Sequence, residues 1–490
     1  MQLPSMSKIL VRGISSSSLA AEAPALASKA SGSAGGQSLA SMLGFGSTRI
    51  DTPLSEPLPW VPSPLRGTAP KAPPKLETGH LASGMPAIAV DTPSPVSTVA
   101  IAFEAGSSSE TEHTRGASKV LAAMAFKATT NRTTFRLTRE LEKIGATPAS
   151  VSSRDHLTLG ITALKMHAPE AFEMLLDSAL NAKLSYHEFA EAVNLVQQQL
   201  RESARQPSSL IMDALHRAAY EGPLGLPMQL DPADLAHLDF GALREYYANV
   251  VKASRTVMAS AGVGMQDMNK LANPLLPPSA SAALVPSSTA GNTYVGGSLN
   301  VIAPSPLTHV AVAVEAKGGL SDPKAEAAAA VVRMLLDASR AVLPRTHRES
   351  DIFVSASAFS QMYSKTGLVG ISAASTPGQS AQLVDAVMQR VEAVAKGVPE
   401  AQLKQAKQMA ISSYKEGLAS SAGMVGTMAP HLLLTGRFEP SDFAAKVDAL
   451  SPSDVSSFIA DGLKRTPSVV SYGSMASAPR LGGVVSKRLA

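Results

Sequence analysis

The chain has 490 residues, of which 45% are hydrophobic and 4% aromatic, so it is long enough to form two or more globular domains. It has no cysteine, which excludes disulfides, thiolate metal sites and cysteine nucleophiles. The net charge of +4 comes from residues 1–75, so the rest of the sequence has no basic excess for nucleic-acid binding. No apolar run approaches the ~18 residues of a membrane-spanning helix.

Residues 1–48 have the composition of a mitochondrial transit peptide. Lys8 and Arg12 flank a short apolar run, a run of serines follows, and Glu22 is the only acidic residue in the segment. Such leaders are basic, rich in serine and poor in acidic residues. An ordinary unstructured tail is the alternative interpretation.

Residues 49–75 form a proline-rich arm. Eight prolines prevent a regular helix or sheet ladder there. The only tryptophan, Trp60, lies in this arm, and a single large side chain in such a position is typical of an anchor to a surface.

The remaining sequence contains an internal repeat. Val99–Ala105 recurs as Val310–Ala316, 211 positions later, and Leu159–Ala163 recurs as Val369–Ala373, 210 positions later. A helical pattern follows the second segment in both copies. Several segments in the same order at a nearly constant offset indicate two homologous domains.

Each copy has the pattern of strand, helix, strand and two helices, with further strands. We therefore predict an α+β fold of two homologous domains, each a largely antiparallel sheet covered by helices. The expected domains are residues 76–285 and 286–490. The boundary between them falls in a stretch rich in proline, serine and alanine, residues 277–292.

One long helix can be placed in each domain. The first should begin at Ser185, where Glu188 completes a capping box, and the second near Pro399, since proline suits a first turn. Gln199 lies beside the predicted core stripe of the first helix. That stripe consists of Phe189, Ala192, Val193, Val196 and Leu200.

A further helix is predicted within residues 115–127. Apolar residues recur there at helical spacing, as in Val120, Leu121 and Met124. Lys119, Ala122 and Ala123 share one face of this helix, because residues three and four apart are neighbours on a helix surface.

This helix resembles the site helix of the inverted-zincin, or pitrilysin-type, peptidases, whose motif is H-x-x-E-H. Met124–Lys127 has the Met-Ala-Phe-Lys run that follows the motif in mitochondrial members. The two histidine positions hold Lys119 and Ala123, and the glutamate position holds Ala122. The last zinc ligand of the family, a glutamate 76 positions after the second histidine, corresponds to Gln199.

These four residues are the wrong types for the family's chemistry. A peptidase zinc needs three protein ligands with nitrogen, sulfur or oxygen donors and a water in the open position. Alanine has no donor, Lys119 is a cation, and Gln199 is a weak neutral donor. No general base remains on the helix to activate water. We expect no catalytic residue, metal or cofactor, and no enzyme activity of the chain on its own.

The resemblance covers roughly residues 76–480. It also rests on Leu141–Ala146, Ser153–Asp155, Leu215–Tyr220, Pro223–Gly225 and Ser357–Gly370. It implies a non-catalytic core subunit of respiratory complex III on the matrix side of the mitochondrial inner membrane. Its implied partners are a β-type subunit (zinc-carrying or core 1) and other complex III subunits, with no nucleic acid. The alternative is the non-catalytic α subunit of an active mitochondrial processing peptidase, or both roles in one complex.

One segment departs from the processing-peptidase pattern. The α subunits of that enzyme carry a glycine-rich loop associated with presequence handling, whereas residues 337–350 form a shorter segment here. No glycine lies between Gly319 and Gly367, so the backbone freedom of such a loop is missing. Basic residues such as Arg345 would also repel a basic presequence. We interpret the segment as a solvated loop, which favours the complex III role.

Overall fold

The computed structural model describes residues 75–81, 83–252, 255–276, 292–337 and 352–473, which all belong to one compact unit, Pro70–Ala490. The predicted transit peptide lies outside the described residues. So do the proline-rich arm, apart from Lys75, and the glycine-free segment, apart from Asp337.

The N-terminal half contains strands β1 (Leu76–His80), β2 (Pro86–Val90), β3 (Val96–Phe103), β4 (Thr147–Ser152), β5 (Leu157–Leu164), β6 (Tyr220–Glu221) and β7 (Thr256–Ala261). Its α-helices are α2 (Ala117–Ala123), α3 (Thr134–Lys143), α4 (Ala168–Leu180), α5 (Tyr186–Ser203), α6 (Pro207–Ala219), α7 (Pro232–Leu235), α8 (Phe240–Val250) and α9 (Met265–Ala272).

The C-terminal half contains strands β8 (Thr293–Tyr294), β9 (Gly297–Ile302), β10 (Thr308–Glu315), β11 (Ser355–Met362), β12 (Gly367–Ser375) and β13 (Ser468–Gly473). Its α-helices are α10 (Pro323–Leu336), α12 (Ser380–Lys396), α13 (Glu400–Gly417), α14 (Ser421–Thr435), α15 (Pro440–Ala449) and α16 (Pro452–Leu463).

Each half is built around one mixed sheet. The first has strand order β1-β2-β7-β3-β5-β4, and the second has the order β9-β13-β10-β12-β11 when it is traced in the same direction. Neighbouring strands are antiparallel except for β2 with β7 and β9 with β13, which occupy equivalent places. The predicted α+β fold of two homologous, largely antiparallel domains is confirmed.

The repeat is shifted by two residues at one strand pair. Val99 pairs with Ile161 in the first sheet. The sequence match equates them with Val310 and Ile371, but Ile371 pairs with Val312 in the second sheet. A shift of two residues keeps every side chain on the same face of the sheet, so the buried pattern is preserved.

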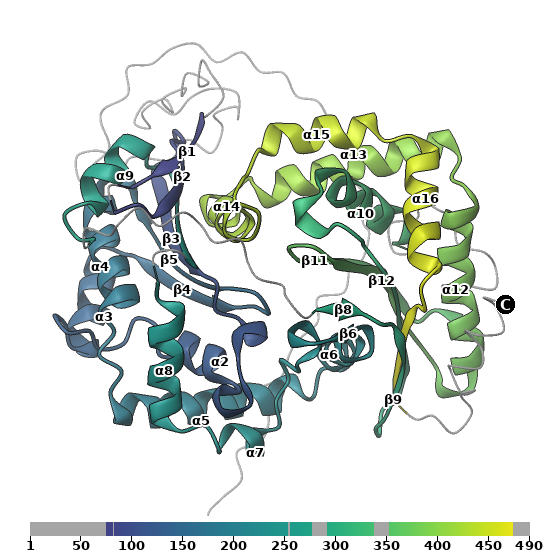
Figure 1. The fold of residues 1–490 in the computed structure, drawn as a ribbon, viewed down its shortest axis with the longest axis horizontal. Coiled ribbons are helices and arrows are strands. Elements are labelled where there is room, and N and C mark those ends of the chain that lie inside the picture. Colours follow the sequence, from purple (N-terminus) through teal and green to yellow (C-terminus); the bar gives the residue numbers. More distant parts are fainter. Residues whose placement is uncertain (1–74, 82, 253–254, 277–291, 338–351, 474–490) are drawn as a thin grey trace, which may run out of the picture. The chain divides into compact units, whose positions relative to one another are not determined.

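Each half packs one of its helices against the sheet of the other half. Val425, Met428 and Leu432 lie on one face of α14 and are buried against β2, β3 and β7 of the other half. In the reverse direction, Ile211 and Leu215 of α6 are buried against β10 and β13. Figure 1 shows α14 beside the N-terminal sheet and α6 beside the C-terminal one. Each fully buried side chain of this size stabilises the fold by about 1.5–3 kcal/mol. These contacts therefore hold the two halves together firmly.

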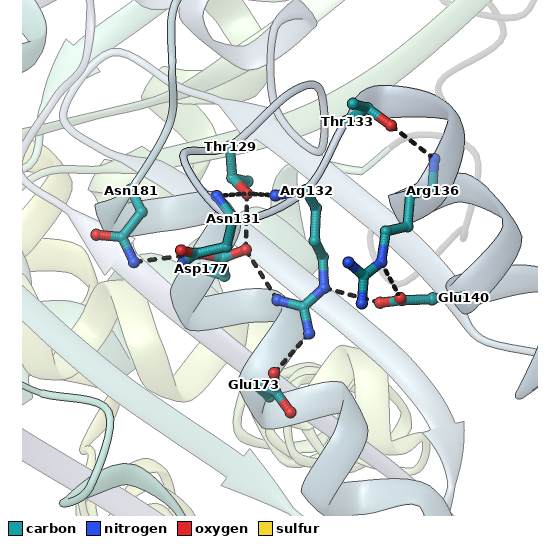
Figure 2. A network of polar contacts seen from close by, with 9 residues as sticks. All are labelled: Thr129, Asn131, Arg132, Thr133, Arg136, Glu140, Glu173, Asp177 and Asn181. Carbon is teal, nitrogen blue, oxygen red and sulfur yellow. Dashed lines mark hydrogen bonds and ion pairs between the residues drawn. The ribbon is translucent and has the colours of Figure 1, made fainter.

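A polar network fixes the connection between α2 and α3. The Arg132 guanidinium donates to Glu140 at 2.7 Å, to Asp177 at 2.9 Å and to Glu173. Asp177 also accepts hydrogen bonds from Thr129 and Asn131, at 2.7 and 2.6 Å. Figure 2 shows these side chains converging from the loop and from helices α3 and α4. The network therefore orients the chain that leaves α2.

Candidate functional site

The four positions that correspond to the family's zinc site lie around one cavity. Lys119, Ala122 and Ala123 come from α2, and Gln199 comes from α5, which packs against it. The cavity has a volume of about 570 Å³, and its other wall includes Pro148, Ala149, Ser150 and Ser152 of the edge strand β4. Helical spacing and the distance of 76 positions thus identify residues that the fold brings together.

The N-terminus of α2 is held by a buried carboxylate. Glu110 accepts hydrogen bonds from the backbone nitrogens of Gly116 and Ser118, at 2.8 and 2.9 Å, and from the Ser118 hydroxyl at 2.6 Å. A negative charge at this end also interacts favourably with the helix dipole. Burial raises the pKa of Glu110 even though these hydrogen bonds act to lower it.

The C-terminal end of α2 is strained. The helix ends at Ala123, and Phe126, which also lines the cavity, has φ of 60°. A bulky residue in the left-handed region costs about 1–3 kcal/mol, so the surroundings must hold it there. The Lys183 nitrogen donates to the Ala128 carbonyl at 3.0 Å, which ties this turn to the chain before α5.

The side chains at this cavity do not fit a zinc ion. Alanine offers no donor atom, and a lysine ammonium repels a metal cation. Burial lowers the pKa of Lys119, while the nearby carboxylates of Asp213 and Glu110 act to raise it. Within the described ranges, no group of three histidine, aspartate or glutamate side chains is placed to share a metal ion.

A second cavity, of about 390 Å³, contains a buried network that the sequence did not predict. Arg154 donates to Asp213 at 2.6 Å and to the Leu226 carbonyl at 2.6 Å. His216 donates through Nδ1 to the Met212 carbonyl and accepts at Nε2 from Tyr363 of the C-terminal half at 2.6 Å. Burial lowers the pKa of His216 to about 3, so this ring is neutral.

The only sequence signals for this network are short family-like runs. Arg154 lies in the Ser-Arg-Asp run and His216 lies in the Leu-His run, and both runs resemble those of the family. Neither run indicates its partner, because Arg154 and Asp213 are 59 positions apart. The contacts of Arg154 and Asp213 are structural, and they position α6 between the two halves.

Comparison with known proteins agrees with this architecture. Residues 87–231 match "Insulinase (Peptidase family M16)", and residues 237–410 match "Peptidase M16 inactive domain". The chain is also 30% identical over 466 residues to the probable mitochondrial-processing peptidase subunit alpha-1 of Arabidopsis thaliana, covering 91% of both chains. The chain belongs to the M16 peptidase family.

One further relative is a cytochrome b-c1 complex subunit, and one solved structure of similar fold comes from complex III2. Cytochrome b-c1 complex subunit 1 of Bos taurus is 29% identical over 276 residues, which is 52% of this chain and 55% of that protein. A chain in the structure of complex III2 from Candida albicans with Inz-5 bound has the same fold, with a TM-score of 0.73 and 18% identity. That match covers 84% of this chain and 99% of the other. Among the described residues, no helix is long and apolar enough to cross a membrane.

Proposed function

We propose that this M16 family member is a non-catalytic subunit that works as one half of a heterodimer with a β-type partner. The observation that carries the proposal is the cavity at α2, which Lys119, Ala122, Ala123 and Gln199 line together. The family resemblance equates these positions with three zinc ligands and a general base. None of them supplies the donor set of a peptidase zinc or takes a proton from water at neutral pH. In this proposal the partner supplies the metal and the base.

The α subunit of a mitochondrial processing peptidase is the assignment that the comparisons favour. The similarity to the alpha-1 relative extends over 91% of both chains, whereas the b-c1 relative is matched over about half of each. Mitochondrial relatives and the composition of residues 1–48 support a location in the mitochondrion. The matrix side of the inner membrane is part of this proposal.

A core subunit of complex III is the second candidate, and it is the role that the sequence favoured first. Its support is the b-c1 relative, together with the glycine-free segment 337–350. The two roles are compatible, because one heterodimer can cleave presequences while it is bound to a membrane complex.

Isolation of the native complex separates the candidates. Mitochondrial membranes would be solubilised in mild detergent and the tagged chain purified, followed by mass spectrometry and a presequence-cleavage assay on the same fraction. Cleavage in a soluble heterodimer supports the peptidase role, and co-purification with cytochromes without cleavage supports the structural one. Both together support a bifunctional complex. A chain that purifies without any M16 partner contradicts the proposal.

A further inference from the structure

The cavity at α2 contains one ionisable side chain, and that side chain has no partner. Among the residues that line it, only Lys119 carries a charge. Within the described part of the chain, the Lys119 ammonium forms no hydrogen bond and no ion pair within 4.0 Å. A half-buried cation without a direct hydrogen-bond or ion-pair partner is unfavourable, because burial removes part of its hydration.

The two carboxylates that attract Lys119 are bound elsewhere. Glu110 is occupied by the backbone nitrogens of Gly116 and Ser118 and by the Ser118 hydroxyl. Asp213 accepts from Arg154 at 2.6 Å and from the Met228 nitrogen at 2.8 Å. Both carboxylates therefore attract Lys119 through space, but neither forms an ion pair with it.

The serine hydroxyls of the cavity wall offer no further donor to a ligand. The Ser152 hydroxyl is buried and forms no hydrogen bond with any described residue. Other hydroxyls of the cavity wall are satisfied: Ser150 donates to the Ala122 carbonyl at 2.9 Å, and Ser203 donates to Gln229 at 2.6 Å. The Ser152 oxygen has almost no accessible surface, so a ligand in the cavity cannot reach it, and Lys119 is the charged group that the cavity offers.

A charged cavity in the C-terminal half provides an internal comparison. It has a similar volume of about 630 Å³, but three of its four cations, all except Lys317, have carboxylate partners. Lys324 pairs with Asp454 at 2.7 Å, and Arg465 pairs with Glu315 at 2.7 Å. The α2 cavity differs because it has a cation and no anion on its walls.

We propose that the α2 cavity binds a carboxylate, with Lys119 as its counter-ion. Hydrogen bonds between an ammonium and a carboxylate are about twice as strong as neutral ones. The ligand is either a small free carboxylate or an acidic side chain of a polypeptide. The inference is independent of the proposed function, because it requires neither zinc nor a partner subunit.

Titration of the full-length chain tests this site. The probes are acetate, observed by ligand NMR, and two blocked nine-residue peptides that differ only in a central glutamate or glutamine, observed by calorimetry. Lys119→Met should weaken binding of acetate or of the glutamate peptide by roughly tenfold or more, whereas Lys119→Arg should retain most of it. The control is Lys317→Met, which removes a lysine from the wall of the other charged cavity and should change nothing.

The outcomes distinguish the ligand sources and can overturn the site. Lys119-dependent binding of acetate alone identifies a free carboxylate as the ligand, and tighter binding of the glutamate peptide identifies an acidic side chain. The proposal fails if neither probe binds, or if Lys119→Met and Lys119→Arg lose binding equally while both unfold at the wild-type temperature. It also fails if Lys119→Met weakens both peptides by the same factor, because the lysine would then not recognise the carboxylate.

Discussion

Replacing Arg132 with methionine should destabilise the fold by about 3 kcal/mol. The Arg132 side chain is 11% exposed and the Asp177 side chain 5% exposed. Without the guanidinium, the Asp177 charge stays buried with only the neutral donors Thr129, Asn131 and Asn181. Breaking a buried ion pair costs about 3–5 kcal/mol, and the lower end applies because these three hydrogen bonds remain.

The pH dependence of this loss follows from Asp177. Burial acts to raise its pKa, but the hydrogen bonds from Thr129, Asn131 and Arg132 outweigh that effect and lower the net pKa. Such a carboxylate stabilises the fold above its unfolded pKa of about 3.9, and this contribution disappears as the pH falls through the folded pKa. The loss caused by Arg132→Met should therefore be equal at pH 7 and pH 5, and smaller below about pH 4.

Urea unfolding followed by circular dichroism measures the effect. Arg136→Met is the matched control, because the Arg136 side chain is 63% exposed and pairs with the same Glu140 one helical turn away. This control substitution should lower the free energy of unfolding by about 0.5 kcal/mol or less. If the two variants lose the same free energy of unfolding at pH 7, the Arg132 network does not act as a buried ion pair and the reasoning is wrong.

Three further changes test other parts of the structure. Burial raises the pKa of Asp155 to about 6, so its ionised form is unfavourable at neutral pH. Asp155→Asn should raise the free energy of unfolding by about 2–3 kcal/mol at pH 8, and the gain should vanish towards pH 4; a pH-independent gain would contradict this. Gly370→Ala would place a Cβ 2.0 Å from the Val312 carbonyl oxygen and should lower the melting temperature, whereas Gly378→Ala has open space and should not. A variant with His, Glu, His and Glu at 119, 122, 123 and 199 should bind one zinc ion by elemental analysis, and no binding would mean that the cavity geometry has changed.

That these four positions lie together could be predicted, because their arrangement depends on local geometry. Three of the four positions share a helical face, and the fourth follows from the family's spacing between two helices. The N-terminus of α5 was predicted correctly: Ser185 is its N-cap and accepts from the Glu188 nitrogen. The predicted capping box is incomplete, because the Glu188 carboxylate accepts from the Ser185 hydroxyl and not from the Ser185 nitrogen. Pro399 is the N-cap of α13 rather than a first-turn residue, a difference of one position.

The long-range arrangement could not be predicted in the same way. Apolar periodicity shows that α6 and α14 each bury a face, but it does not show that each face lies on the sheet of the other half. The sequence pattern also gives no sign of the two-residue shift between the repeated strands, because the shift leaves the buried faces unchanged. The strained turn at Phe126 carries no glycine or asparagine that would indicate a positive φ.

Metal content and peptidase activity of the purified chain test the central claim most directly. The full-length chain would be purified without a partner, incubated with excess zinc, desalted and analysed by elemental mass spectrometry, with a fluorogenic presequence peptide as substrate. We expect no stoichiometric zinc and no cleavage. One equivalent of zinc with cleavage that a chelator abolishes would contradict the assignment of this chain as a non-catalytic subunit.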